Sequence, residues 1–151
     1  MSEENIRLII TPLRPQDQVA ARRLILAGLE ERWGSLDSLT NPDLDDLGEH
    51  YRQAIFLLAW LGDELVGSGA LIAEAPGIGR IVRMSVARLH RRTGIGQQIL
   101  AALLSAARER GYHQLVLETT STWQNAIHFY QGQGFYITGE KDGDTHLKLD
   151  L

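Results

Sequence analysis

Residues 80–100 read RIVRMSVARLHRRTGIGQQIL, and this stretch decides the fold. The β-branched, apolar run at residues 80–86 predicts a strand. Two arginines and two glycines follow within residues 91–96, and the apolar residues beyond them recur at helical spacing as far as the glycine at position 111. That spacing predicts a helix over residues 94–111. A strand, a glycine-rich turn and a helix in this order are typical of α/β proteins that bind phosphate groups.

The turn has the chemistry of an anion-binding site. The first N–H groups of a helix lack intrahelical partners, and the helix macrodipole adds partial positive charge at the same end. Gly94 and Gly96 permit positive φ angles and close backbone approach, while Arg91 and Arg92 can donate charge-assisted hydrogen bonds. The alternative is a glycine-rich connection with incidental arginines.

Two common phosphate motifs do not fit this turn. A P-loop requires Lys followed by Ser or Thr after its second glycine, where Gln97 and Gln98 stand. A dinucleotide fingerprint requires a small residue at the position of Ile99. The pattern therefore excludes both.

Outward from this stretch, the patterns predict an element order of β-α-α-β-β-β-α-β-α-β-β. Strands are expected at residues 6–13, 54–61, 65–73, 80–86, 113–119, 135–138 and 146–151, and helices at residues 19–33, 42–52, 94–111 and 122–131. Gly67 and Gly69 would weaken their strand unless a neighbour or a ligand approaches closely. Early hairpins and a late βαβ crossover predict an α/β (α+β) fold in one domain, with a mixed sheet and helices on its faces.

Composition excludes several classes of function. The chain has 151 residues, 44% of them hydrophobic, with a formal net charge of −4 and no cysteine. It therefore has no disulfide, no thiol nucleophile and no overall basic field for nucleic acid. No apolar run approaches the roughly 20 residues of a membrane helix, and the first residues do not resemble a signal peptide. The five histidines lack metal-ligand spacing, so we expect no metal site and a soluble, cytoplasmic protein.

Two stretches carry a family resemblance. Arg91-x-x-Gly94-x-Gly96, after a strand and before an amphipathic helix, resembles the acetyl-CoA pyrophosphate motif of the GNAT N-acetyltransferase superfamily. Residues 115–135, LVLETTSTWQNAIHFYQGQGF, resemble the later motif of that superfamily, with Phe-Tyr ending a helix before Gly-Phe. The resemblance spans about residues 6–150 in element order and is most specific over residues 80–135.

The resemblance implies a GNAT-like, mostly antiparallel twisted sheet whose one parallel strand pair splays apart, within a single N-acetyltransferase domain over residues 1–151. The donor would be acetyl-CoA, with no metal, and its pantetheine arm would insert between the parallel strands as a surrogate strand. The residues implied to hold it are Met84, Ser85 and Val86 along the strand, Arg91, Arg92, Thr93, Gly94, Ile95 and Gly96 around the pyrophosphate, and Asn125 near the pantetheine.

The resemblance also implies catalytic roles. Tyr130 matches the Phe-Tyr position whose hydroxyl faces the thioester sulfur, so we expect it to act as general acid; the alternative is a core tyrosine. Many family members carry a glutamate base on the strand equivalent to residues 80–86, but this strand has no carboxylate. Glu118 is the best substitute, and the alternative is a strand-end carboxylate in a salt bridge with Arg83. Glu74 is a weaker candidate that would act through a water molecule.

A second departure from the family lies at Trp123. The family often has Asn three residues before the helix Ala, here Ala126, and Trp123 occupies that place. Asn125 is shifted by two positions, so it does not simply inherit the contact. Trp123 would pack on the cofactor, line the acceptor pocket or belong to the core.

The acceptor is less explicit in the sequence. Residues 34–49 hold five carboxylates and no cation, which indicates either a solvated acidic face or an acidic lip that attracts a cationic substrate. His50 borders this segment. We expect direct acetyl transfer to a primary amine of a small cationic molecule or of a peptide or protein, with a homodimer through an exposed last strand as a further expectation. The alternatives are a non-catalytic acyl-CoA-binding regulatory module and a phosphate-binding protein of unrelated chemistry.

Overall fold

The element order predicted from the sequence is confirmed. A computed structural model describes residues 6–33 and 41–151. Its strands are β1 (Leu8–Pro12), β2 (Ile55–Leu61), β3 (Glu64–Ala75), β4 (Ile78–Val86), β5 (Gln114–Thr120), β6 (Tyr136–Lys141) and β7 (Asp144–Asp150). Its α-helices are α1 (Gln18–Trp33), α2 (Leu47–His50), α3 (Ile95–Glu109) and α4 (Gln124–Gly132), joined by the 3-10 turns η1 (Pro15–Asp17), η3 (Pro42–Asp45) and η4 (Arg88–His90).

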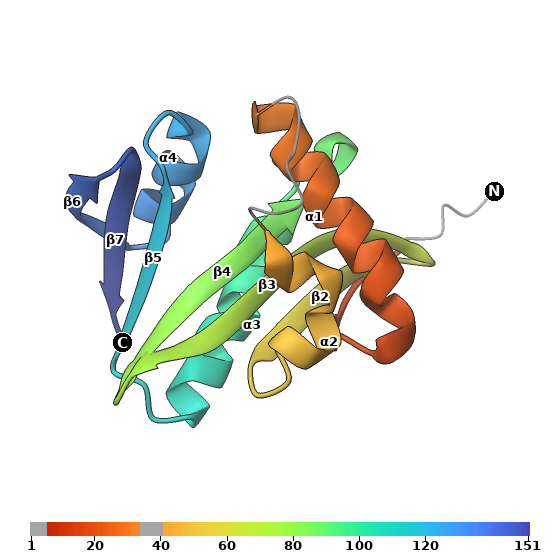
Figure 1. Ribbon diagram of the computed structural model, residues 1–151, viewed down its shortest axis with the longest axis horizontal. Coiled ribbons are helices and arrows are strands. Elements are labelled where there is room, and N and C mark those ends of the chain that lie inside the picture. Colours follow the sequence, from red (N-terminus) through yellow and green to blue (C-terminus); the bar gives the residue numbers. More distant parts are fainter. Residues whose placement is uncertain (1–5, 34–40) are drawn as a thin grey trace.

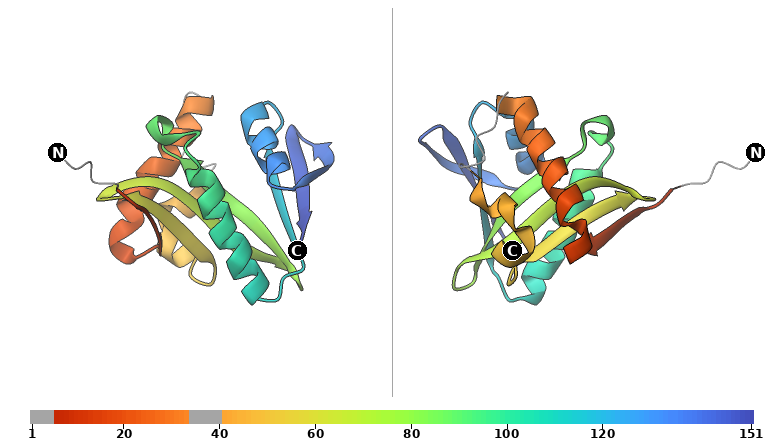
Figure 2. Two further views of the ribbon diagram at one scale, coloured as in Figure 1. Left: turned by 180° about the vertical axis from the view of Figure 1, so that it is seen from behind. Right: turned by 45° about the vertical axis from the view of Figure 1, so that its right-hand side comes forward.

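Within the described residues, seven strands form one sheet in the order β1-β2-β3-β4-β5-β7-β6 (Figure 1). Neighbouring strands are antiparallel except β4 and β5, which run parallel and are connected through α3. Their recorded pairing joins residues 78–80 to residues 114–116, after which the two strands diverge (Figures 1 and 2). The predicted mixed sheet with one splayed parallel pair is confirmed.

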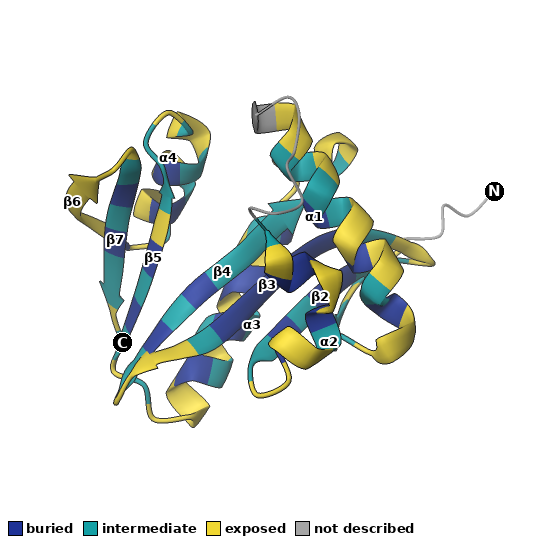
Figure 3. Cartoon of the chain, in the orientation of Figure 1, coloured by how far each residue is buried: buried dark blue, intermediate teal, exposed yellow. Residues whose placement is uncertain are grey.

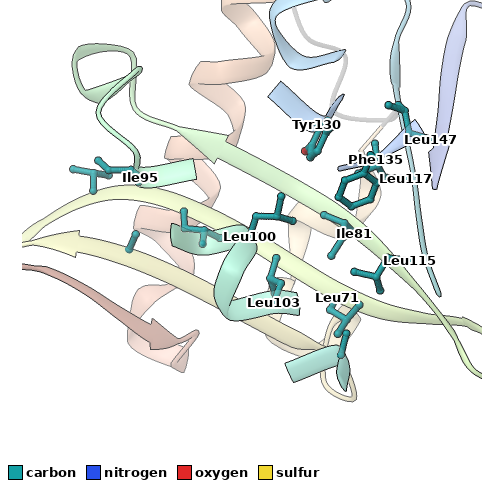
Figure 4. Close-up of a cluster of buried hydrophobic side chains, with 14 residues drawn as sticks. Leu71, Ile81, Ile95, Leu100, Leu103, Leu115, Leu117, Tyr130, Phe135 and Leu147 are labelled. Atoms are coloured by element: carbon teal, nitrogen blue, oxygen red, sulfur yellow. The ribbon is translucent and has the colours of Figure 1, made fainter. Parts of the chain in front are cut away.

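Helices cover both faces of the sheet, as the sequence predicted. Helices α1 and α2 lie on one face, while α3 and α4 lie on the other (Figures 1 and 2). The buried residues gather in bands along the sheet beneath these helices (Figure 3). The larger cluster joins the apolar stripe of α3 to inward side chains of β3, β4, β5 and β7 (Figure 4). Burying each large apolar side chain contributes about 1.5–3 kcal/mol, so these two clusters hold the sheet between its helices.

Two glycines explain how closely α3 approaches the sheet. A Cβ on Gly67 would lie 2.6 Å from Cδ1 of Ile99 in α3, and one on Gly69 would lie 2.8 Å from Cγ2 of the same residue. Only glycine leaves room for these contacts. The expectation that a neighbour approaches these two glycines closely is confirmed.

A β-bulge lies in β4 where it begins to leave β5. The register with β3 changes between Ser68 and Ala70, which pair with Ser85 and Val82, so β4 carries an extra residue there. Arg83 takes a φ of 55° within the bulge. Its carbonyl leaves the ladder and accepts a hydrogen bond of 2.8 Å from the Ser68 hydroxyl. A bulge bends its strand, which is consistent with the divergence of β4 from β5.

Two expectations from the sequence are wrong in detail. The helix expected over residues 42–52 is split into η3 and the single turn α2, because Asp46 has extended φ and its side chain accepts a hydrogen bond of 3.1 Å from the Glu49 N–H. Asp46 is therefore an N-cap that starts a second helix. The last strand, β7, is not an exposed edge, since it pairs with β5 on one side and β6 on the other. The edge at this end of the sheet is β6.

Among the described helices, none has the length and apolar character needed to cross a membrane.

Candidate active site

A cavity of about 1020 Å³ opens where β4 and β5 diverge. We call its two parts the turn side, formed by residues 84–97 and 123–130, and the wall side, formed by residues 41–51 with parts of α1, β4, β5 and β7. The predicted site residues that line it are Met84, Ser85, Val86, Arg91, Arg92, Gly94, Ile95, Gly96, Glu118, Asn125 and Tyr130. The fold thus brings together all of the predicted site residues except Thr93.

The strand on the turn side offers mainly its backbone to the cavity. The position of a Cβ on Gly69 is occupied by the Met84 thioether, so that side chain points toward α3. A Cβ on Gly28 would lie 3.1 Å from the Ser85 hydroxyl, so that side chain points toward α1. Because successive side chains of a strand point to opposite faces, the edge of residues 84–86 that faces β5 presents backbone groups.

The start of α3 forms an anion-binding end. Gly94 is its N-cap and has a φ of +88°, with no atom within 4 Å of the position that a Cβ would take. The first intrahelical hydrogen bond runs from the Gln98 N–H to the Gly94 carbonyl, at 3.1 Å. The N–H groups of residues 95–97 precede it and have no intrahelical acceptor. Such free N–H groups at a helix start are the geometry at which anions bind in proteins, and the anion site predicted from the sequence rests on these groups.

The cations of the turn differ in their contacts. The Arg91 Nε donates to the Val86 carbonyl at 3.1 Å, and its Nη1 lies 2.7 Å from the Glu31 carboxylate of α1. Arg91 therefore ties the turn to both β4 and α1. Arg92, with a φ of 62°, is exposed and lines the cavity. Thr93 is exposed and its hydroxyl donates to the His90 carbonyl, which closes the loop instead of facing the cavity.

Tyr130 is both a core residue and a cavity residue. It is 8% exposed and packs edge-to-face against Phe129 and Phe135, with ring centroids 5.1 Å and 5.6 Å away. Figure 4 shows it beside Phe135 at one end of the buried cluster. The same residue lines the cavity, so the two interpretations of Tyr130 from the sequence are compatible.

Glu118 lies on β5 between two basic side chains. Its Oε1 is 3.4 Å from Nη1 of Arg80 and its Oε2 is 3.6 Å from Nδ1 of His146. The alternative of a strand-end carboxylate in a salt bridge is found, but its partner is Arg80 and not Arg83, whose side chain binds Asp43 of η3. The Glu118 side chain is 46% exposed and lines the cavity, so it is accessible to a bound molecule.

Glu74 is engaged by the same arginine. Arg80 donates to both oxygens of Glu74, at 2.7 Å and 3.0 Å, and this hydrogen bonding lowers the pKa of the Glu74 carboxyl below its ordinary value. Glu74 does not line the cavity among the described residues. Glu118 is therefore the better placed of the two candidate bases.

A buried ion pair forms the wall side. Arg83 donates to both oxygens of Asp43, at 2.8 Å and 2.6 Å, and to the Asn41 side chain at 3.1 Å. The Tyr51 hydroxyl also donates to Asp43, at 2.6 Å. Burial acts to raise the pKa of Asp43, but the hydrogen bonds from Arg83 and Tyr51 outweigh it and hold the pKa below its ordinary value. Burial, and then the bond to Asp43, raises the pKa of Tyr51 to about 12.

These contacts change the interpretation of the acidic segment. Asp43 is neutralised by Arg83, Asp46 caps α2, and Asp45 is exposed and is not among the lining residues. Asp37 lies outside the described residues. The carboxylates that do line the wall side, besides the paired Asp43, are Glu118 and Asp144, which come from β5 and β7.

Two residues at the start of α4 face the cavity. Trp123 is the N-cap of α4, Asn125 follows in its first turn, and both are lining residues. His50, which borders the acidic segment in the sequence, also lines the cavity. No group of His, Asp and Glu within the described ranges could hold a metal ion.

Sequence reasoning missed Asp144 and the structural role of Arg83. The local pattern Asp142-Gly143-Asp144 indicates only a turn, and the position of Asp144 opposite Thr120 of β5 follows from strand pairing that no local pattern reveals. Arg83 joins Asp43 across 40 residues of sequence. An arginine at the centre of a predicted buried strand is the signal that could have marked it, since such a charge requires a partner.

Comparison with known proteins gives a consistent family assignment. Residues 20–135 match the model of the acetyltransferase (GNAT) family. The chain is 36% identical to N-acetyltransferase 8F1 of Rattus norvegicus over 106 residues, which cover 66% of this chain and 48% of that protein. It is 39% identical over 82 residues to a Bacillus subtilis protein named Uncharacterized N-acetyltransferase YsnE, covering 53% of this chain and 54% of that one. The chain spans about half the length of the curated relatives it matches.

Solved structures share the fold. A GNAT-family acetyltransferase of Staphylococcus aureus Mu50 superposes with a TM-score of 0.87 at 20% identity, covering 96% of this chain and 99% of that one. The PaiA N-acetyltransferase of Thermoplasma acidophilum, solved in complex with coenzyme A, superposes with a TM-score of 0.85 at 15% identity and the same coverage. At these identities the likeness establishes the fold alone.

Proposed function

The chain belongs to the GNAT family of acetyltransferases, and from this premise we propose that it transfers an acetyl group from acetyl-CoA to a primary amine. The observation that carries the proposal is one continuous cavity between β4 and β5. It joins an anion-binding helix end to a tyrosine and a carboxylate that face the same space.

The turn side would hold the donor. The free N–H groups at the start of α3, together with Arg92, suit a pyrophosphate, and the backbone edge of residues 84–86 suits the amides of a pantetheine arm. Both features are contiguous along the cavity. The coenzyme A bound to the PaiA N-acetyltransferase supports this ligand class for the fold.

The chain's own groups suit direct transfer. The donor would supply an acetyl group already activated as a thioester, so no nucleophilic side chain is needed. Glu118 would accept a proton from the amine as its nitrogen bonds to the acetyl carbon, and Tyr130 would donate its phenolic proton to the sulfur as the carbon–sulfur bond breaks. The proton returned from Glu118 through solvent restores Tyr130, so the cycle balances.

The wall side favours a cationic acceptor. Its arginines, Arg80 and Arg83, are each paired with carboxylates, while Asp144 lines the cavity with no ion pair to any described residue. Glu118 remains accessible beside it. The carboxylates of Glu118 and Asp144 would attract a small cationic amine, or the amine of a peptide or protein.

Two measurements test the proposal. Isothermal titration compares acetyl-CoA with ATP and NAD, and a thiol-release assay follows turnover with 1,4-diaminobutane, lysine amide, phenethylamine and an alanine-terminated tripeptide as acceptors. We expect selective binding of acetyl-CoA and thiol release with at least one amine, with the acetylated product identified by mass spectrometry. Equal binding of the three nucleotides would overturn the donor assignment.

One observation supports a second candidate function. Strand β4 has no carboxylate, and Glu118 is partly engaged by Arg80. A non-catalytic acyl-CoA-binding module would show selective binding of acetyl-CoA and no thiol release with any amine. That result would replace the transferase proposal by the binding module.

A further inference from the structure

Arg83 connects the two sides of the cavity through its backbone and its side chain. Its backbone forms the bulge of β4, with a φ of 55° and a carbonyl held by the Ser68 hydroxyl at 2.8 Å. That bulge directly precedes residues 84–86, which edge the turn side. Its side chain extends in the opposite direction, to Asp43 on the wall side.

The contact with Asp43 is buried and geometrically specific. Two parallel N–H···O bonds join the side chains, which are 18% and 9% exposed. The Tyr51 hydroxyl donates a hydrogen bond of 2.6 Å to Asp43. It uses the same oxygen that accepts from the Arg83 Nε. Bidentate pairs of this kind fix orientation as well as distance, and burial protects them from screening by salt.

The segment that Asp43 anchors has little regular structure of its own. Residues 41–51 form η3 and α2, each four residues long. Helices of that length are not stable without tertiary contacts. Leu44 and Leu47 provide apolar anchoring in the core, while the bonds from Arg83 anchor the polar edge that faces the cavity.

We infer that Arg83 is a positioning residue that fixes the segment 41–51 against the bulge of β4 and thereby sets the width of the acceptor space. This inference rests on the proposed function, because it concerns which amines fit opposite Glu118. It goes beyond that function in assigning acceptor selectivity to an ion pair whose charged groups are bonded to each other. The donor contacts, made by backbone and by the start of α3, do not depend on the pair.

The chain offers a matched control for this ion pair. Arg14 and Asp17 form the same bidentate contact, at 2.8 Å and 3.0 Å, with Asp17 in a 3-10 turn and its side chain 4% exposed. This pair is not among the cavity-lining residues. Asp43→Asn and Asp17→Asn therefore each weaken a bidentate pair with a buried carboxylate, although the Arg14 side chain is 55% exposed and that of Arg83 is 18% exposed. Only the first pair lines the cavity.

The experiment compares these two variants, with Tyr51→Phe as a milder change at the Asp43 cluster. For Asp43→Asn we expect the amine KM to rise about tenfold and the ranking of the four amines to flatten, because small misplacements cost large factors. The acetyl-CoA Kd is expected to stay within about twofold, since the donor contacts are independent. Tyr51→Phe should give a smaller change in the same direction, and Asp17→Asn should leave both quantities unchanged.

Hydrogen exchange gives a readout that does not require turnover. Amides of residues 41–51 should exchange faster in Asp43→Asn than in the wild type and in Asp17→Asn. Unchanged exchange there would overturn the inference even if no amine is acetylated. Equal rises of amine KM in Asp43→Asn and Asp17→Asn, or a parallel rise in acetyl-CoA Kd, would also overturn it. Absence of turnover in the wild type, with faster exchange in Asp43→Asn, would instead count against the transferase function while the anchoring role stands.

Discussion

The two sides of the cavity are built in different ways. The turn side is made by two stretches of chain, residues 84–97 and 123–130, and its anion-binding groups are backbone N–H groups at the glycine-capped end of one helix. The wall side is made by side chains from α1, η3, β4, β5 and β7, held by pairs such as Asp43–Arg83 that are distant in sequence. A backbone site changes little with mutation, whereas a side-chain site changes with each substitution. The comparison therefore predicts that donor binding and acceptor choice can be altered separately.

The largest effect is expected where the two sides meet, at Tyr130. Phenylalanine at this position keeps the ring contacts with Phe129 and Phe135 and removes the phenolic proton. Loss of a general acid should lower kcat by about 100-fold, with the acetyl-CoA Kd unchanged by titration. Tyr136→Phe, which removes an exposed hydroxyl on β6, is the control and should retain wild-type kcat. A Tyr130→Phe protein with wild-type kcat would remove the general-acid assignment.

The second largest effect is expected on donor binding at the turn side. Gly94→Val places a β-branched side chain at a φ of +88°, which costs about 1–2 kcal/mol of strain or shifts the turn. We expect the acetyl-CoA Kd to rise about tenfold, as such a cost implies. Gly111→Val is the matched control, because Gly111 also has positive φ, at +78°, and also has no atom within 4 Å of a Cβ, but lies at the opposite end of α3.

Both glycine variants should lose similar stability by thermal unfolding. Only Gly94→Val should lose donor affinity, and the amine KM of both at saturating donor should be that of the wild type. If Gly111→Val weakens acetyl-CoA binding equally, the effect is global and the backbone description of the turn side fails.

The same difference explains what the sequence could predict. The fold followed from local patterns: Gly94 caps the start of α3, the helix ends at Glu109 shortly before Gly111, and alternating strands flank short turns. The order of elements then fixed the mixed sheet, because a βαβ crossover requires parallel neighbours. Two features were not predicted. The helix expected over residues 42–52 is divided by the cap at Asp46, and the place of β7 between β5 and β6 depends on long-range contacts.

The wall side shows why the rest was not predictable. The aspartates between residues 37 and 46 indicate one acidic surface in the sequence. In the structure, Asp43 forms an ion pair with Arg83 and Asp46 caps α2. Two arginines of β4 carry the same charge in sequence, yet Arg80 reaches Glu118 and Arg83 reaches Asp43. Successive side chains of a strand point to opposite faces of the sheet, and a β-bulge such as the one at Arg83 changes this alternation. Such pairs depend on the tertiary fold.

A smaller effect is expected at Asp144, where the wall side meets a cationic acceptor. Asp144 lines the cavity, whereas Asp142 is exposed in the adjacent turn and is not a lining residue. For 1,4-diaminobutane as acceptor, Asp144→Asn should raise the KM about threefold, as expected for a partly exposed charge pair. Added salt should reduce the difference from the wild type.

Asp142→Asn is the control, and asparagine tolerates its φ of 53°. It should leave the KM for 1,4-diaminobutane unchanged. If the two variants behave alike, the attraction comes from net charge and not from the wall side. An unchanged KM in Asp144→Asn would remove this carboxylate from acceptor binding.

The last effect is one on stability and not on activity, and it concerns the wall side at high pH. Burial and the bond to Asp43 raise the pKa of Tyr51 from 10.0 to about 12, so the folded protein keeps this phenolic proton at pH values where the unfolded chain has lost it. The stability that Tyr51 contributes is therefore fully present below pH 10 and declines as the pH rises toward 12. The slope from this group is at most about 1.4 kcal/mol per pH unit.

Urea unfolding at several values between pH 9 and 11.5 measures this slope. Tyr51→Phe should be less stable than the wild type at pH 9, because Asp43 loses a hydrogen bond. The gap should then narrow as the pH rises, since the variant has no proton to lose at this site. Tyr112→Phe, which alters a tyrosine outside the Asp43 cluster, should follow the wild-type slope. Parallel curves for Tyr51→Phe and wild type would mean that Asp43 does not hold this phenol in its protonated form, and the wall side would then be anchored by Arg83 without Tyr51.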